Sequence, residues 1–196
     1  MPSTPARMVV SVFVTCVVAA AGLAVTYQLT AERIAEQARL AEERALQAVL
    51  PDATEFTPVD DDVLSAAVRA AGETRVDAVF AGKSASGEVG WGVKVAPRGY
   101  GGPMRMVVGL DRDGLVTGVS VITHNETPGL GSNVVTDPDF MGQFVGWDGT
   151  DIDKAAKALD AISGATKSSY GVRKGVLAAG HIYAEVLEGT EGVSGQ

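Results

Sequence analysis

The most pronounced hydrophobic pattern is an apolar run near the start of the chain. Residues 8–29 contain no charged side chain, and as a helix they would reach roughly 33 Å, against a bilayer core of ~30 Å. The run predicts a transmembrane helix over residues 8–29, preceded by a short segment, residues 1–7. A cleaved signal peptide is the alternative, because Arg7 precedes a run that contains three consecutive alanines. We favour an uncleaved anchor, since the apolar part of a signal peptide usually ends after ~7–15 residues.

The pattern then changes to that of a charged helix. Residues 30–50 are rich in Ala, Glu, Arg, Gln and Leu, lack Gly and Pro, and stop before Pro51. Apolar residues recur in them at helical spacing, for example Ile34, Ala38 and Ala41. This segment predicts a helical stalk that continues the membrane helix.

Beyond Pro51 the pattern predicts an α+β domain over residues 51–188 and a flexible tail over residues 189–196. Residues 51–72 are expected to be acidic and irregular up to a short helix after Asp60-Asp61-Asp62; these aspartates suit a helix N-terminus better than a calcium site. Alternating apolar positions and turn residues predict a mixed or antiparallel sheet with packed helices. The expected strands are residues 76–81, 90–96, 104–111 and 116–123, with a hairpin at residues 111–114, and the last helix is expected over residues 167–187.

Composition excludes several classes of function. The formal net charge is −8, and every acidic residue follows Leu29; a nucleic-acid partner is therefore not expected, because phosphate backbones need a basic surface. The single cysteine, Cys16, permits no intrachain disulfide and no cysteine cluster for zinc or iron–sulfur. We interpret Cys16 as a small apolar residue of the membrane helix rather than a lipoprotein site. Redox chemistry would need an organic cofactor or a metal held by a partner.

The candidate chemistry centres on the segment Asp160-Ala161-Ile162-Ser163-Gly164-Ala165-Thr166-Lys167-Ser168. It places the Thr166 hydroxyl after a Ser-Gly-Ala turn, at the expected start of a helix. Helix N-terminal amides and the helix dipole favour an anion there, so that a phosphate joined to Thr166 would be held by backbone. Ser168 could add a hydroxyl donor and Lys167 a charge. On residue types alone an ordinary Ser/Thr helix cap remains the alternative.

Two glycine-rich loops flank one predicted strand pair. The first is Tyr100-Gly101-Gly102-Pro103, and the second runs from His124 to Gly131. Both should emerge at the same edge of the sheet, where Leu130 would offer a planar ring an apolar face and Glu126 or Thr127 polar contacts. A metal site at His124 and His181 is not supported by their spacing. Trp91 and Trp147 are expected in the core or at its rim.

These motifs occur together, and in the same order, in one family. The segment from Asp160 to Ser168 resembles the signature of the covalent FMN-binding domain, and with both loops and the N-terminal anchor the chain resembles the G subunit of the Rnf-type ion-translocating electron-transport complex. The C subunit of the sodium-translocating NADH:quinone oxidoreductase is a related alternative. The resemblance implies that Thr166 carries FMN through a phosphoester and performs no catalysis. We also expect further FMN contacts, at Ser163, Gly164, Ala165, Lys167, Ser168, Glu126, Thr127, Leu130 and Gly131.

The resemblance also implies partners and a location. A separate flavin transferase would attach the FMN from FAD, and other subunits of an inner-membrane complex would couple ferredoxin and NAD oxidoreduction to ion transport. The resemblance places residues 1–7 in the cytoplasm and the FMN domain on the periplasmic side, which the arginines around the span leave undecided. No metal and no complete enzymatic activity are expected of this chain alone. A non-redox membrane-anchored interaction module and a stand-alone flavin reductase are the alternatives.

Overall fold

The first helix carries the predicted membrane run. The computed structural model describes residues 5–148 and 160–188, and the tail predicted at residues 189–196 lies outside them. Helix α1 (Pro5–Val49) is the one helix among those residues that is long and apolar enough to cross a membrane, judged by length and composition. The chain divides into two compact units, Met1–Ala41 and Glu42–Gln196. The last two turns of α1 therefore belong to the same unit as the sheet.

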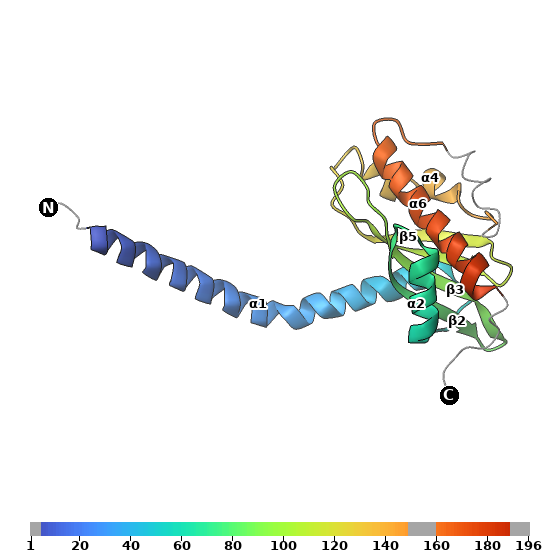
Figure 1. Ribbon diagram of the computed structural model, residues 1–196, viewed down its shortest axis with the longest axis horizontal. Coiled ribbons are helices and arrows are strands. Elements are labelled where there is room, and N and C mark those ends of the chain that lie inside the picture. Colours follow the sequence, from blue (N-terminus) through green and yellow to red (C-terminus); the bar gives the residue numbers. More distant parts are fainter. Residues whose placement is uncertain (1–4, 149–159, 189–196) are drawn as a thin grey trace. The chain divides into compact units, whose positions relative to one another are not determined.

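The centre of the second unit is a five-stranded antiparallel sheet in the order β1-β2-β3-β4-β5 (Figure 1). Its strands are β1 (Glu55–Pro58), β2 (Arg75–Ser84), β3 (Gly87–Ala96), β4 (Arg105–Asp111) and β5 (Val116–Thr123). The four strands expected from alternation are confirmed as β2 to β5. Strand β1 lies in the stretch expected to be irregular; it is only four residues long and ends in proline, as edge strands can.

One face of the sheet forms the larger core. Met106, Val108 and Leu110 alternate along β4 and are fully buried, together with Val172 and Val176 of the last helix. Figure 1 shows α2 and α6 lying over this sheet. Among the residues that the structure describes, the helices of this unit are α2 (Asp61–Ala70), α3 (Asn133–Thr136), α4 (Pro138–Gly142) and α6 (Thr166–Ile182), which continues as a π-helical turn, η2 (Tyr183–Leu187).

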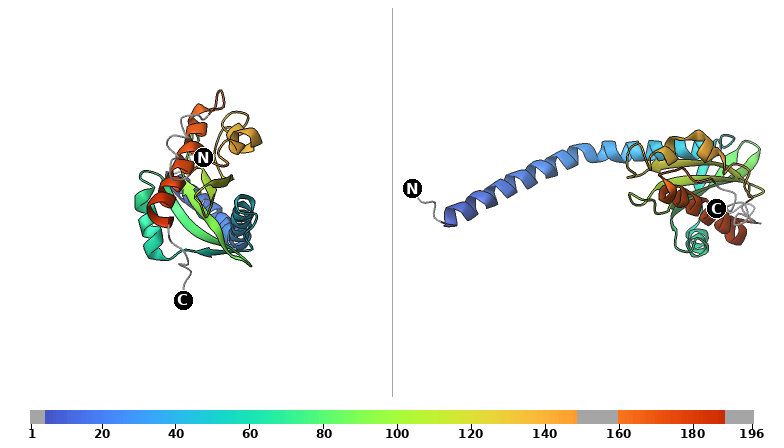
Figure 2. Two further views of the ribbon diagram at one scale, coloured as in Figure 1. Left: turned by 90° about the vertical axis from the view of Figure 1, so that its right-hand side faces the viewer. Right: turned by 90° about the horizontal axis from the view of Figure 1, so that it is seen from above.

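The opposite face packs against the end of α1 (Figure 2). Gly92, Gly109 and Gly118 are direct cross-strand partners on β3, β4 and β5, and we call this row the glycine lane. A Cβ atom on Gly109 would lie 2.6 Å from the carbonyl oxygen of Val49, and one on Gly92 would collide with the Leu46 side chain. The Thr117 hydroxyl donates a hydrogen bond to the same carbonyl, at 2.5 Å. The absence of side chains along the lane thus lets a helix end approach the sheet closely.

Candidate functional site

The segment singled out in the sequence forms a turn that leads directly into α6. Ser163 and Gly164 make the turn, where Gly164 has φ +79°, and Thr166 is the first residue of the helix. The Ala165 amide donates to the Ile162 carbonyl at 3.0 Å. The buried Ser169 hydroxyl accepts the Ile162 amide at 3.1 Å. The predicted position of Thr166 at the start of the last long helix is confirmed.

The N-terminus of α6 has no side-chain cap. Ala165 occupies the capping position, and none of the described side chains accepts a hydrogen bond from the first helical amides there. Two nearby hydroxyls, those of Ser168 and Ser169, donate hydrogen bonds elsewhere, to Glu126 and to the Ala165 carbonyl. The amides of the first turn have no partner within their own helix, so this end of α6 suits an anion. The alternative of an ordinary Ser/Thr cap does not describe this helix.

The two glycine-rich loops meet at one edge of the sheet, as predicted. They flank the β4–β5 pair at the end where Arg105 faces Thr123. The Gly101 amide in the first loop donates a hydrogen bond to Oε1 of Glu126 in the second loop, at 3.0 Å. Glu126 therefore ties the loops together.

Glu126 is also the link from the loops to α6. Its side chain is buried, with only 5% of the residue exposed, and its Oε2 accepts a hydrogen bond from the Ser168 hydroxyl at 2.5 Å. A Cβ atom on Gly99 would collide with Oε1, and one on Gly131 would collide with Oε2. Glycines thus leave the space that the carboxylate occupies. The sequence predicted that Glu126 makes a polar contact to a ligand. In the structure its buried carboxylate also connects three segments, the two loops and α6, and we call this arrangement the Glu126 bracket.

A cavity of about 360 Å³ opens beside this bracket. Its lining includes eight of the predicted contact residues, namely Glu126, Thr127, Leu130, Gly131, Gly164, Ala165, Lys167 and Ser168. Ser163 and Thr166 do not line it, although Thr166 is exposed and its neighbours on both sides do. Tyr100 is a lining residue that the site prediction omitted. The Lys167 ammonium lies 5.6 Å from the centre of the Tyr100 ring.

The remaining candidates have structural places. His124 accepts the Glu126 amide through Nδ1 at 3.2 Å, and so shapes the second loop. Trp91 is buried in the larger core against Tyr183, and Trp147 packs on Phe144. Both tryptophans are in the core or at its rim, as expected. In the described parts of the chain, no three histidine, cysteine or acidic side chains gather as metal ligands would.

The chain matches two family models. Residues 99–180, which span both loops, the β4–β5 pair and nearly all of α6, match the FMN-binding domain. Residues 11–49, within α1, match the RnfG N-terminal region. The two matches fall on the two parts of the chain that the hydrophobic pattern distinguishes, the anchor with its stalk and the domain.

Two similar proteins agree with these matches. The chain is 35% identical to the G subunit of an ion-translocating oxidoreductase complex from Methanosarcina acetivorans, over 85% of this chain and 87% of that protein. It is 34% identical to the G subunit of the Na(+)-translocating ferredoxin:NAD(+) oxidoreductase complex of Acetobacterium woodii, over 84% of each. Among solved structures, NqrC of Shewanella oneidensis matches with a TM-score of 0.45 and 26% identity, over 64% of each chain. From the two model matches and these two relatives, the chain belongs to the family of G subunits of Rnf-type ion-translocating oxidoreductase complexes.

Proposed function

We propose that this protein carries FMN on Thr166 through a phosphoester and passes electrons as the G subunit of an Rnf-type complex. The observation that carries the proposal is the position of Thr166. Its exposed hydroxyl begins the uncapped end of α6, between residues that line a cavity. A hydroxyl there joins a phosphate next to amides that have no helical partner.

The residues around the cavity fit such a group. The first amides of α6 would hold the phosphate, and Lys167 would add positive charge. Tyr100 and Leu130 are 70% and 54% exposed at the cavity and would cover an apolar ring. FMN supplies the one- and two-electron chemistry, while the protein sets its position and its electrostatic surroundings. Glu126 and Ser168 form a fixed polar floor, because each is buried and bonded to the other.

Attachment requires a separate flavin transferase in this proposal. The Thr166 oxygen loses its proton and bonds to the FMN phosphorus of FAD; the bond between the two phosphates breaks, and AMP leaves. Thr166 itself then takes no part in electron transfer. Covalent attachment suits a domain on the periplasmic side of the inner membrane, anchored by residues 8–29, because a dissociated flavin is hard to replace there. The tether also raises the effective concentration of the domain near its partner subunits.

The test is to make the full chain together with its flavin transferase and to follow Thr166 by mass spectrometry. We expect the peptide that contains Thr166 to gain the mass of FMN less one water, and the denatured band to fluoresce in a gel. Thr166→Val should abolish both signals. Thr127→Val, which removes another exposed hydroxyl at the same cavity, should retain the adduct. An unmodified Thr166 peptide, under conditions that flavinylate a control protein, would contradict the proposal and favour the non-redox interaction module.

A further inference from the structure

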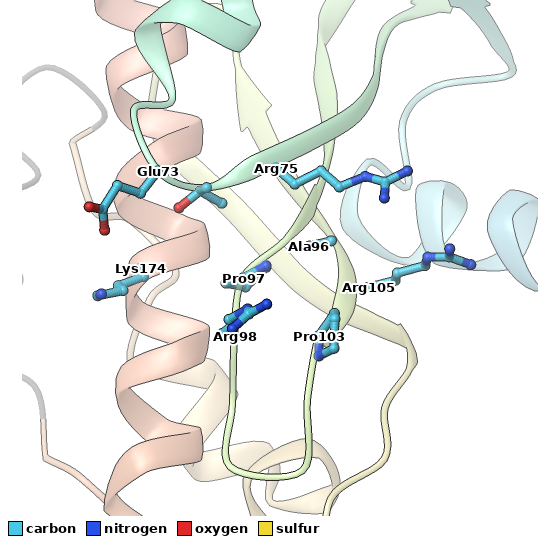
Figure 3. Close-up of a pocket in the computed structure, with 9 residues that line it drawn as sticks. Glu73, Arg75, Ala96, Pro97, Arg98, Pro103, Arg105 and Lys174 are labelled. Atoms are coloured by element: carbon cyan, nitrogen blue, oxygen red, sulfur yellow. The ribbon is translucent and has the colours of Figure 1, made fainter.

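A second cavity, of about 380 Å³, lies beside the hairpin of residues 97–103 (Figure 3). Its lining includes four cationic side chains, Arg75, Arg98, Arg105 and Lys174, and one acidic side chain, Glu73. We call it the basic pocket. This concentration of positive charge occurs in a chain whose net charge is −8. Charge of the opposite sign to the rest of the chain, distributed around one hollow, favours an anionic partner.

Two of the cations have an ion-pair partner and two do not. Arg75 and Arg105 share the carboxylate of Asp77, with their Nε atoms 2.6 and 3.6 Å from its oxygens. For Arg98 and Lys174, the described part of the chain provides no acidic group within 4.0 Å. Both side chains belong to exposed residues, so two positive charges remain for a partner.

The hairpin that carries Arg98 is held firmly. The Gly99 amide donates to the Gly102 carbonyl at 2.8 Å, and the Met104 amide donates to the Pro97 carbonyl at 2.9 Å. The hairpin also packs closely on α6, since a Cβ atom on Gly171 would lie 2.9 Å from the Arg98 carbonyl oxygen. The backbone under Arg98 is thus fixed against the same helix that presents Lys174.

The basic pocket adjoins the candidate flavin cavity. The hairpin contributes Arg98 to the former and Tyr100 to the latter, and α6 contributes Lys174 and Lys167 in the same way. Lys167 and Lys174 are seven residues apart, or about 10 Å along a helix. A molecule bound at the basic pocket would therefore lie next to the candidate flavin cavity.

The geometry points to an acidic segment of a partner subunit, one that exchanges electrons with the flavin, as the occupant of the basic pocket. This inference rests on the proposed function. In Figure 3 Arg75 and Arg105 extend to one side of the pocket and Lys174 to the other, with Arg98 between them. A single small anion needs donors that converge, whereas a segment with several carboxylates matches cations that are spread out. An anionic membrane would also face the negative charge of the rest of the chain, which repels it, whereas an acidic segment needs only to enter the basic pocket.

The test uses native membranes that contain the whole complex and a water-soluble carbodiimide, which joins an amine to a carboxylate in contact with it. We expect mass spectrometry to find the Lys174 amine linked to an Asp or Glu of another subunit. Arg98→Glu should lower the yield of that link about three- to tenfold, and added salt should lower it too. Lys83→Glu is the matched control, because Lys83 lies toward the other end of β2 from Arg75 and should leave the yield unchanged. Lys174→Arg keeps the charge but removes the reactive amine, and should abolish the link while the complex still assembles.

Several results would overturn the inference. The first is a link from Lys174 only to its own chain, such as to Glu73. The second is an equal loss of yield in Arg98→Glu and Lys83→Glu, and the third is no link to any subunit. Binding of the flavinylated chain to phosphatidylglycerol vesicles that Arg98→Glu abolishes, without a protein link, would assign the pocket to lipid and likewise overturn it. Flavin fluorescence of the same bands reports attachment separately. A fluorescent protein without the link refutes only the docking site, and a linked protein without flavin refutes only the proposed function.

Discussion

The substitution Glu126→Ala tests whether the buried carboxylate supports the site. It removes the acceptor of the Ser168 hydroxyl and of the Gly101 amide. Ser168 is only 1% exposed, so its hydroxyl would be left buried without that acceptor, at about 1–3 kcal/mol. Gly101 is exposed, so water can replace part of its hydrogen bond. With the space vacated between Gly99 and Gly131 included, the expected loss of unfolding free energy is about 2–4 kcal/mol.

The assay is thermal unfolding of the full chain in detergent, followed by the fluorescence of Trp91 and Trp147. For a domain of this size the loss corresponds to a fall in Tm of about 5–15 °C. Glu126→Gln keeps an acceptor for the Gly101 amide and a partner for Ser168, and should lose less than half as much. Glu185→Ala, an exposed carboxylate on η2, should stay within about 0.5 kcal/mol of the parent protein. If Glu126→Ala unfolds at the same temperature as Glu185→Ala, the carboxylate is not a structural bracket and the reasoning is refuted.

Two further predictions concern the core. Gly109→Ala should lower the unfolding free energy by about 1–3 kcal/mol, because its Cβ would lie 2.6 Å from the Val49 carbonyl oxygen. Gly142→Ala, whose Cβ would meet nothing within 4 Å, is the control; equal Tm values for the two variants would contradict the close packing of α1. Burial, followed by the nearby acidic residues Glu188, Asp113, Asp111 and Asp148, raises the pKa of Tyr183 above its ordinary value of 10.0. The folded state thus favours the neutral phenol. The contribution of this pKa shift to the unfolding free energy is complete below pH 10 and is lost as the pH rises through the folded pKa. Tyr183→Phe also loses the 2.8 Å hydrogen bond to the Arg112 carbonyl, so it should be less stable than the parent at pH 8 by about 0.5–1.5 kcal/mol, and the gap should narrow above pH 10. Urea unfolding between pH 8 and 11 measures the stability difference between the parent protein and Tyr183→Phe at each pH. A difference that widens with pH would contradict the predicted direction of the pKa shift.

Much of the fold follows from local pattern. Alternation along β4 assigns Met106, Val108 and Leu110 to one face, and the structure buries all three. The start of α6 at Thr166 followed from a glycine turn next to a long apolar stripe. The meeting of the two loops followed from the antiparallel pair between them, since such a pair returns the chain to the same edge.

Other features depend on contacts that no local pattern encodes. The glycine lane exists because strand register aligns residues from three strands, and each of these glycines alone reads as a weak strand position. Strand β1 is too short to alternate visibly and is defined by its pairing with β2. The sequence predicted Glu126 to contact a ligand, because a charged residue in a loop is ordinarily exposed. Its burial became evident only when Ser168 was brought beside it. An aromatic residue next to a glycine-rich loop is the sequence signal from which Tyr100 could have been predicted to line the cavity.

The glycine lane has a mechanical consequence for an anchored electron carrier. With Leu46 and Val49 seated over the lane, residues from Glu42 onward turn as one piece with the sheet. A hinge at Pro51, just after the end of α1, would have to pull the end of the helix away from the glycine lane. Any reorientation that delivers the flavin to successive partners must therefore arise at Ala41 or nearer the N-terminus. The end of α1 moves rigidly with the domain and is not its hinge.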